Sequence, residues 1–223
     1  MSVERGLAVR AVVRPYGSAL PLAFFAFGIG MFLLGGQALG WIQQSDQKQA
    51  GIFLASFVFP LEFLAAVIAF LSRDGATGAA LGLFSTSWLG FGLVSLVGTP
   101  GKVSSAEGIY LLGFTAMVMA LAIASFAAKP LLGMLLWASA LRAVLAGVYQ
   151  LGAARGFDRA AGVIAIFIFA VSVYAGLAFT FEESKQKAVL PTFRRGDSAE
   201  AMGGAGSADP SHLVREAGVR TQL

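Results

Sequence analysis

AGIFLASFVFPLEFLAAVIAFLS, residues 50–72, is long and apolar enough to cross a lipid bilayer. A helix needs about 20 apolar residues to span a hydrocarbon core of about 30 Å. Two residues interrupt the run near its middle: Pro60, which predicts a kink, and the acid Glu62. A charge at mid-membrane costs about 2.5–3.5 kcal/mol on insertion scales, so we expect Glu62 to face protein or water rather than lipid.

The composition of the whole chain indicates a polytopic membrane protein. Of its 223 residues, 57% are hydrophobic and 13% are charged, and a soluble domain could not hide that much apolar surface. Further apolar runs lie at about 19–41, 76–98, 107–127, 130–152 and 159–181. We therefore predict an all-α fold with six transmembrane helices in a bundle over 19–181. A cytoplasmic leader over 1–18 and a flexible cytoplasmic tail over 182–223 complete the chain.

The basic residues predict that both ends of the chain face the cytoplasm. With six spans, the side that holds the termini collects Arg5, Arg10, Arg14, Arg73, Lys129, Lys185, Lys187, Arg194 and Arg195. The opposite side collects Lys48, Lys102, Arg155 and Arg159. The expected location is the cell membrane, inner or plasma, and the net charge of +4 is a topology signal rather than a nucleic-acid patch.

Several classes of chemistry are disfavoured. The chain has no cysteine, and its one histidine, His212, lies in the polar tail, so we expect no metal site and no cofactor. The sequence has no HExxH motif, no paired membrane carboxylates and no phosphate-binding glycine loop. A transporter or channel is therefore favoured over an enzyme.

One other formal charge lies deep in an apolar run, and this is Arg142, midway through 130–152. We favour direct neutralisation of Glu62 by Arg142 between helices. The alternative is functional: Arg142 would hold an anionic solute, and Glu62 would accept a coupled proton.

The third run carries the hydroxyl residues Ser85, Thr86 and Ser87, followed by Trp88. They could line a solute path, but we favour hydrogen bonds from these hydroxyls to carbonyls one turn earlier. The pairs Gly36–Gly40 and Gly78–Gly82 have the GxxxG spacing that allows close helix contacts.

The segment 161–191 resembles the last helix and exit of the acetate uptake transporter family. Its shared features are Tyr174 in a small-residue helix and Val189-Leu190-Pro191 after it. The first run is similar to that family's opening motif at Pro21, Leu22 and Phe27-Gly28. The similarity covers roughly 18–195.

The resemblance implies a hexamer of six-helix protomers that moves a small monocarboxylate such as acetate; the dicarboxylate succinate is the family's other typical solute. It also implies a narrow gate, which carries over to Phe27, to Thr86 or Trp88 depending on the alignment, and to Ser139 or Leu141. The family's first-motif asparagine is Ser18 here, and Glu62 and Arg142 have no family counterpart.

The predicted function is a transporter or channel for a small monocarboxylate, with proton symport as a further hypothesis. Its predicted partners are the solute, the lipid bilayer and other copies of the chain, without nucleic acid. A channel for a neutral solute such as ammonia, an amide or urea is one alternative, and a non-transporting scaffold or sensor is another.

Overall fold

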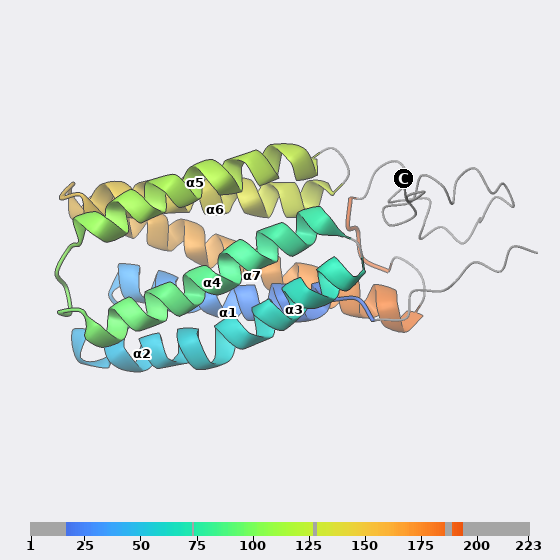
Figure 1. The fold of residues 1–223 in the computed structure, drawn as a ribbon, viewed down its shortest axis with the longest axis horizontal. Helices are drawn as coiled ribbons and strands as arrows, with labels where there is room; N and C mark the ends of the chain where they lie inside the picture. Colours follow the sequence, from blue (N-terminus) through green and yellow to red (C-terminus); the bar gives the residue numbers. More distant parts are fainter. Residues whose placement is uncertain (1–16, 73, 127–128, 186–188, 194–223) are drawn as a thin grey trace, which may run out of the picture.

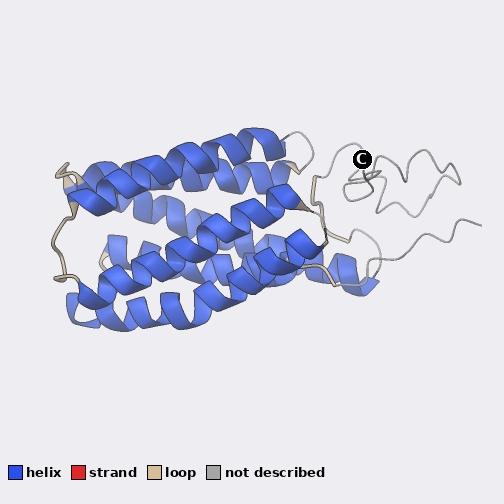
Figure 2. Cartoon of the chain, in the orientation of Figure 1, coloured by secondary structure: helices blue, strands red, loops and turns tan. Residues whose placement is uncertain are grey.

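The computed structural model describes residues 17–72, 74–126, 129–185 and 189–193. Within these residues, six helices are long and apolar enough to cross a membrane, and no strand is present (Figures 1 and 2). The spans are α1 (Leu20–Leu39), a composite second span, α4 (Gly75–Val97), α5 (Ser105–Phe126), α6 (Pro130–Gln150) and α7 (Arg155–Lys185). The predicted all-α, six-span fold is confirmed. Nearly all of the predicted leader, and the tail beyond 193, lie outside the described residues.

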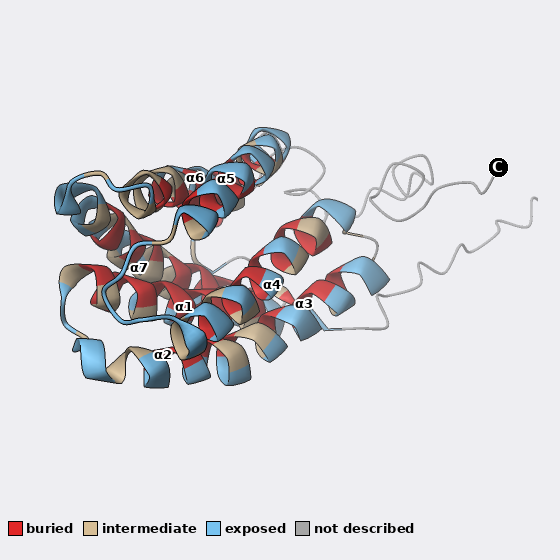
Figure 3. Cartoon of the chain, turned by 60° about the vertical axis from the view of Figure 1, so that its left-hand side comes forward, coloured by how far each residue is buried: buried red, intermediate tan, exposed pale blue. Residues whose placement is uncertain are grey.

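The helices form three pairs, α1 with α7, α5 with α6, and α3 with α4, and α6 also packs on α7. Figure 1 shows α5 and α6 along one side of the bundle and α2, α3 and α4 along the other, with α1 and α7 between them. Buried residues face the interior, and the outward faces are exposed (Figure 3). This is the burial pattern expected of a bundle that lipid or other copies surround.

The pair α1 and α7 is held together by small residues. A Cβ on Gly28 would lie 3.2 Å from the Cβ of Ser172, and one on Gly35 would lie 2.7 Å from Ile166. At the start of α1, the Ser18 hydroxyl accepts a hydrogen bond from Leu20 N (3.3 Å), and Ser18 N donates to Glu183 Oε1 (3.1 Å). These bonds tie the beginning of α1 to the end of α7.

The second span is built from η1 (Gln44–Asp46), α2 (Gln47–Phe53), the π-helical turn η2 (Leu54–Val58) and α3 (Phe59–Leu71). The π turn ends two residues before Pro60. Pro60 has no N–H, and its ring would clash with the carbonyl of residue 56 in a regular helix. The predicted irregularity therefore takes the form of a widened turn. Gly51 on α2 and Gly92 on α4 meet backbone to backbone, since a Cβ on either would lie within 2.8 Å of the other's carbonyl oxygen.

Of the four glycines in the two predicted GxxxG pairs, only Gly78 makes a close contact with another helix of this chain. Gly40 ends α1 in the left-handed conformation (φ 79°), and a Cβ on it would meet nothing within 4 Å. Gly82 also faces open space, whereas a Cβ on Gly78 would lie 2.9 Å from the ring of Phe70 on α3. The spacing alone could not identify the helix contacts because glycines recur throughout the chain.

The last helix is longer than predicted, since α7 runs from Arg155 to Lys185 rather than over 159–181. Its 31 residues give a length of about 46 Å at 1.5 Å per residue, which exceeds a hydrocarbon core. Pro191 lies beside α7, where the Tyr174 hydroxyl donates to the Pro191 carbonyl (2.8 Å). The two features that carried the family resemblance are thus in direct contact.

Candidate functional site

Four aromatic side chains from three helices meet inside the bundle, and we call them the aromatic collar: Phe27 on α1, Phe84 and Trp88 on α4, and Phe114 on α5. The ring centroids of Phe27 and Phe84 lie 4.9 Å apart, those of Phe27 and Trp88 5.9 Å, and those of Phe84 and Phe114 5.1 Å, all edge to face. All four side chains are buried. Edge-to-face contact is a favoured geometry for aromatic rings, so the collar closes the space between α1, α4 and α5.

Two further aromatic residues extend the collar toward one end of the bundle. Phe91 contacts Trp88 and Tyr110 at centroid distances of 6.4 and 6.0 Å. The Tyr110 hydroxyl is 2.7 Å from the hydroxyl of Ser87.

Trp88 is fixed from two sides. Its ring lies against Gly30 of α1, where a Cβ would be 2.9 Å from the indole. Its indole N–H donates to the carboxylate of Glu62 on α3. Glu62 is completely buried, as the cost of exposing it to lipid requires. The second carboxylate oxygen, Oε1, has no hydrogen-bond partner among the described residues.

The structure does not pair Glu62 with Arg142, so the predicted neutralisation is wrong. The charged side chains that act on Arg142 are Asp158 and Glu107. The reason is topological: α3 packs mainly against α4 and α1, whereas α6 packs against α5 and α7. Similar depth in the membrane could not reveal that the two residues belong to different parts of the bundle.

The hydroxyl run of α4 is satisfied by its own helix. Ser85 and Thr86 each donate to the Gly82 carbonyl (2.9 and 3.0 Å), and Ser87 donates to the Leu83 carbonyl (2.7 Å). This is the arrangement that we favoured. Ser85 is buried and Thr86 is exposed.

Two predicted gate residues lie away from the collar. Thr86 faces outward, and Leu141 on α6 is 52% exposed. Ser139 is buried and donates to the Leu135 carbonyl (2.7 Å). Of the aligned alternatives, Phe27 and Trp88 are the two that the structure brings together. Of the motif residues, Pro21 lies in the first turn of α1, Leu22 is half-buried, and Gly28 forms the contact with α7.

A cavity of about 400 Å³ opens at the end of the bundle opposite Ser18 and Lys185, and we call it the distal cavity. Its apolar floor is formed by Leu34, Phe91 and Leu111, and Phe91 connects this floor to the collar. Its polar walls include Gln37, Lys102, Glu107, Arg142, Tyr149, Gln150, Arg155 and Asp158. Within the described residues, no group of three acidic or histidine side chains could hold a metal ion.

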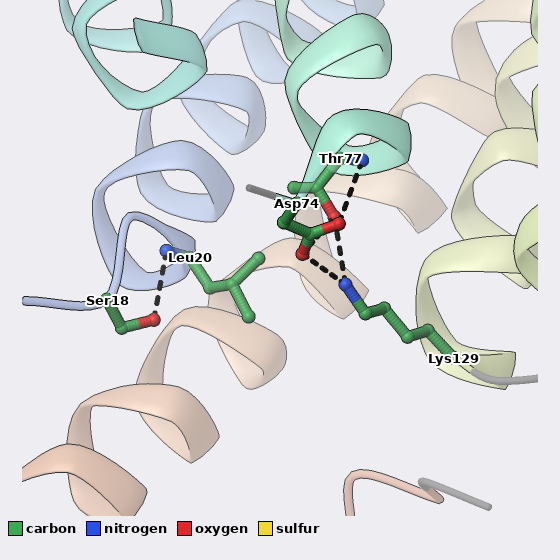
Figure 4. A network of polar contacts seen from close by, with 5 residues as sticks. All are labelled: Ser18, Leu20, Asp74, Thr77 and Lys129. Atoms are coloured by element: carbon green, nitrogen blue, oxygen red, sulfur yellow. Dashed lines mark hydrogen bonds and ion pairs between the residues drawn. The ribbon is translucent and has the colours of Figure 1, made fainter. Parts of the chain in front are cut away.

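At the other end, Asp74 joins two corners of the bundle (Figure 4). It caps α4 by accepting from Thr77 N (3.3 Å) and from the Thr77 hydroxyl (2.8 Å). It also forms an ion pair with Lys129, at the start of α6. Burial alone would raise the pKa of Asp74, but the Lys129 charge and hydrogen bonds from Lys129 and Thr77 bring that pKa below its ordinary value.

Sequence reasoning missed Phe84, Phe91, Tyr110 and Phe114. A signal was present: Phe84, Trp88 and Phe91 follow the i, i+4, i+7 spacing of one helix face, and Tyr110 and Phe114 are four apart. In a chain with 19 phenylalanines, that spacing gives no indication of which aromatic faces lie inside.

The sequence matches no family model and no curated protein. Among solved structures, it is similar to the bacterial acetate channel SatP, with a TM-score of 0.71 and 15% sequence identity. The match covers 79% of this chain and 99% of the SatP chain. The two proteins share one fold. The family resemblance drawn from the motifs is confirmed at the level of the fold, and the chain is a multi-pass membrane protein.

Proposed function

We propose that this protein is a channel or transporter that carries a small monocarboxylate, with acetate as the model solute, across the membrane. The aromatic collar carries this proposal: a closely packed apolar cluster inside the bundle that Phe91 links to the polar distal cavity. An apolar constriction can exclude larger solutes by size and by dewetting. The shared fold with a channel whose solute is acetate supports the same solute class.

Purified protein reconstituted into liposomes tests the proposal by uptake of radiolabelled acetate. We expect acetate uptake well above that of protein-free liposomes, with succinate and urea measured in parallel. Uptake of urea or ammonia without acetate would make the protein a neutral-solute channel. Absence of flux for every solute would favour a scaffold or sensor, and either result would overturn the proposal.

We further propose that transport is coupled to protons through Glu62. This carboxylate is buried against Trp88, so its protonation would change the hydrogen bond that holds one wall of the collar. The proposal predicts faster acetate uptake when an inward proton gradient is imposed.

The proposed orientation places both chain ends in the cytoplasm and the distal cavity on the outer face of the cell membrane. It is supported by the excess of basic residues on the terminal side of the helices. A periplasm-active reporter fused after Gly196 should give no signal, whereas the same reporter inserted at Thr99 should be active. A signal after Gly196 and none at Thr99 would show that the topology is the opposite of the proposed one.

A further inference from the structure

Arg142 is the most unusual side chain of the distal cavity. It lies within the membrane-spanning part of α6 and is only 8% exposed. Among the described residues it makes no ion pair and no hydrogen bond, and its Nε is buried without an acceptor. A buried guanidinium without an acceptor is costly, so the arrangement calls for an anionic or polar ligand.

A second donor without an acceptor lines the same cavity from another helix. The amide nitrogen of Gln37 on α1 is buried and has no hydrogen-bond partner among the described residues. A carboxylate offers two oxygens with about four acceptor positions, so it can accept from an arginine and an amide together. Hydrogen bonds that involve such charged groups are short and strong.

The charges around Arg142 must allow an anion to enter. Glu107 on α5 and Asp158 on α7 act on Arg142 electrostatically, but neither lies within ion-pair distance of it. Lys102 and Arg155 also line the cavity. Three cations against two anions leave the lining with a net positive charge of one, which favours a monovalent anion over a cation.

The floor of the cavity suits a short apolar group. Leu34, Phe91 and Leu111 form it, and Leu34 lies two helical turns, or about 10 Å, from the collar residue Phe27 along α1. We propose that the distal cavity is a binding site for a small monocarboxylate anion. Arg142 and Gln37 hold the carboxylate, and the alkyl group points toward the collar. The choice of ligand rests on the proposed function; the site itself rests on the two donors.

Binding of ¹³C-labelled acetate and propionate to the purified protein in detergent, followed by NMR titration, tests the site directly. Arg142→Gln should weaken acetate binding about ten- to a hundredfold, and Gln37→Leu about tenfold or more, the range expected for hydrogen bonds to charged groups. Arg159→Gln is the matched control, because this exposed residue on the same side lies outside the cavity. Its affinity should equal that of the parent.

Glu107→Gln provides an independent test in the opposite direction. Removing a negative charge beside Arg142 should tighten acetate binding if the ligand is an anion, and weaken it if the cluster attracts cations. The site is overturned if the parent does not bind acetate, if Arg142→Gln binds like the parent, or if Glu107→Gln binds more weakly. Acetate flux in liposomes without binding would refute the site and leave the proposed function standing. Binding of acetate without flux would refute the proposed function and leave the site standing.

Discussion

At the scale of single residues, the size of the permeating solute should depend on Phe27 and Trp88. Both are deeply buried, so replacing either by alanine would cost about 3–5 kcal/mol of stability. Phe27→Leu and Trp88→Phe are the sharper variants, because they shorten the collar but keep more of the apolar side chain than alanine does. Trp88→Phe also leaves the buried Glu62 carboxylate without its indole donor, which should cost about 1–3 kcal/mol more. We expect both to keep a monodisperse elution profile and to admit propionate and butyrate, which the parent should exclude.

The control for the collar is Phe25→Leu, since this neighbouring aromatic on α1 is 37% exposed and lies outside the collar. Its size cutoff should match that of the parent. If Phe27→Leu and Trp88→Phe fold normally but show the parent's cutoff, the two rings pack the bundle and do not gate it.

Glu62 has two proposed roles, proton coupling and positioning of Trp88, and single substitutions can separate them. Glu62→Gln keeps an oxygen that accepts from the Trp88 indole but cannot release a proton at physiological pH. If the residue couples transport to protons, this variant should lose most of the stimulation by a proton gradient and keep downhill acetate exchange. Glu62→Leu also removes the acceptor, so it should destabilise the protein by about 1–3 kcal/mol.

If the proton gradient still stimulates acetate uptake fully in Glu62→Gln, then Glu62 only positions Trp88. Asp46→Asn, at the acid that ends η1 and lies outside the collar, is the matched control and should respond like the parent.

At the scale of elements, the contact between the start of α4 and the start of α6 depends on Asp74 and Lys129. Because the folded-state pKa of Asp74 lies below its ordinary value of 3.8, the ion pair stabilises the protein above that value. The stabilisation is lost as the pH falls through the folded-state pKa. Asp74→Asn keeps the cap but removes the charge, so we expect a loss of about 1 kcal/mol at neutral pH.

Thermal unfolding in detergent from pH 3 to pH 8 measures this contribution. The difference in melting temperature between the parent and Asp74→Asn should be constant from about pH 5 upward and should shrink below about pH 4. Lys129→Gln should show the same narrowing. A gap that widens on acidification would contradict a depressed pKa for Asp74.

The elements also show what the sequence could and could not predict. Length and hydropathy located all six spans, because each must cross the bilayer. The bounds were less well predicted: the second span begins at Gln44 rather than at residue 50, and α7 extends four residues further at each end. The π turn before Pro60 was predictable as an irregularity but not in its form. The partner of Glu62 was not predictable, because depth along a helix carries no information about which face meets which neighbour.

At the scale of the whole molecule, the candidate site depends on contacts between distant segments. The collar joins residues 27, 84, 88 and 114, and the distal cavity joins the ends or starts of six helices. Phe27 and Trp88 entered the prediction through the family resemblance and Arg142 through its isolated charge. Neither route pointed to Gln37, Phe84 or Phe114, and only the packing of the helices identified these residues.

The outward surface of the bundle is the feature that bears on assembly. On α4, Gly82, Thr86 and Gly90 recur every four residues along an outward-facing strip, and a Cβ on either glycine would meet no described residue within 4 Å. Small residues at this spacing let membrane helices of different copies approach closely. Together with the family resemblance, this strip leads us to expect an oligomer, with six copies as the working number.

Mass measurement in a mild detergent, corrected for bound detergent and lipid, tests the expected assembly. The parent should run as a hexamer, and Gly90→Leu should shift most of the protein to smaller species because the leucine side chain would hold neighbouring helices apart. Gly113→Leu is the control, since Gly113 on α5 also faces open space but lies outside the strip. A parent that is monomeric in every mild detergent would exclude a stable oligomer. An unchanged mass for Gly90→Leu would place the contact between copies on another helix.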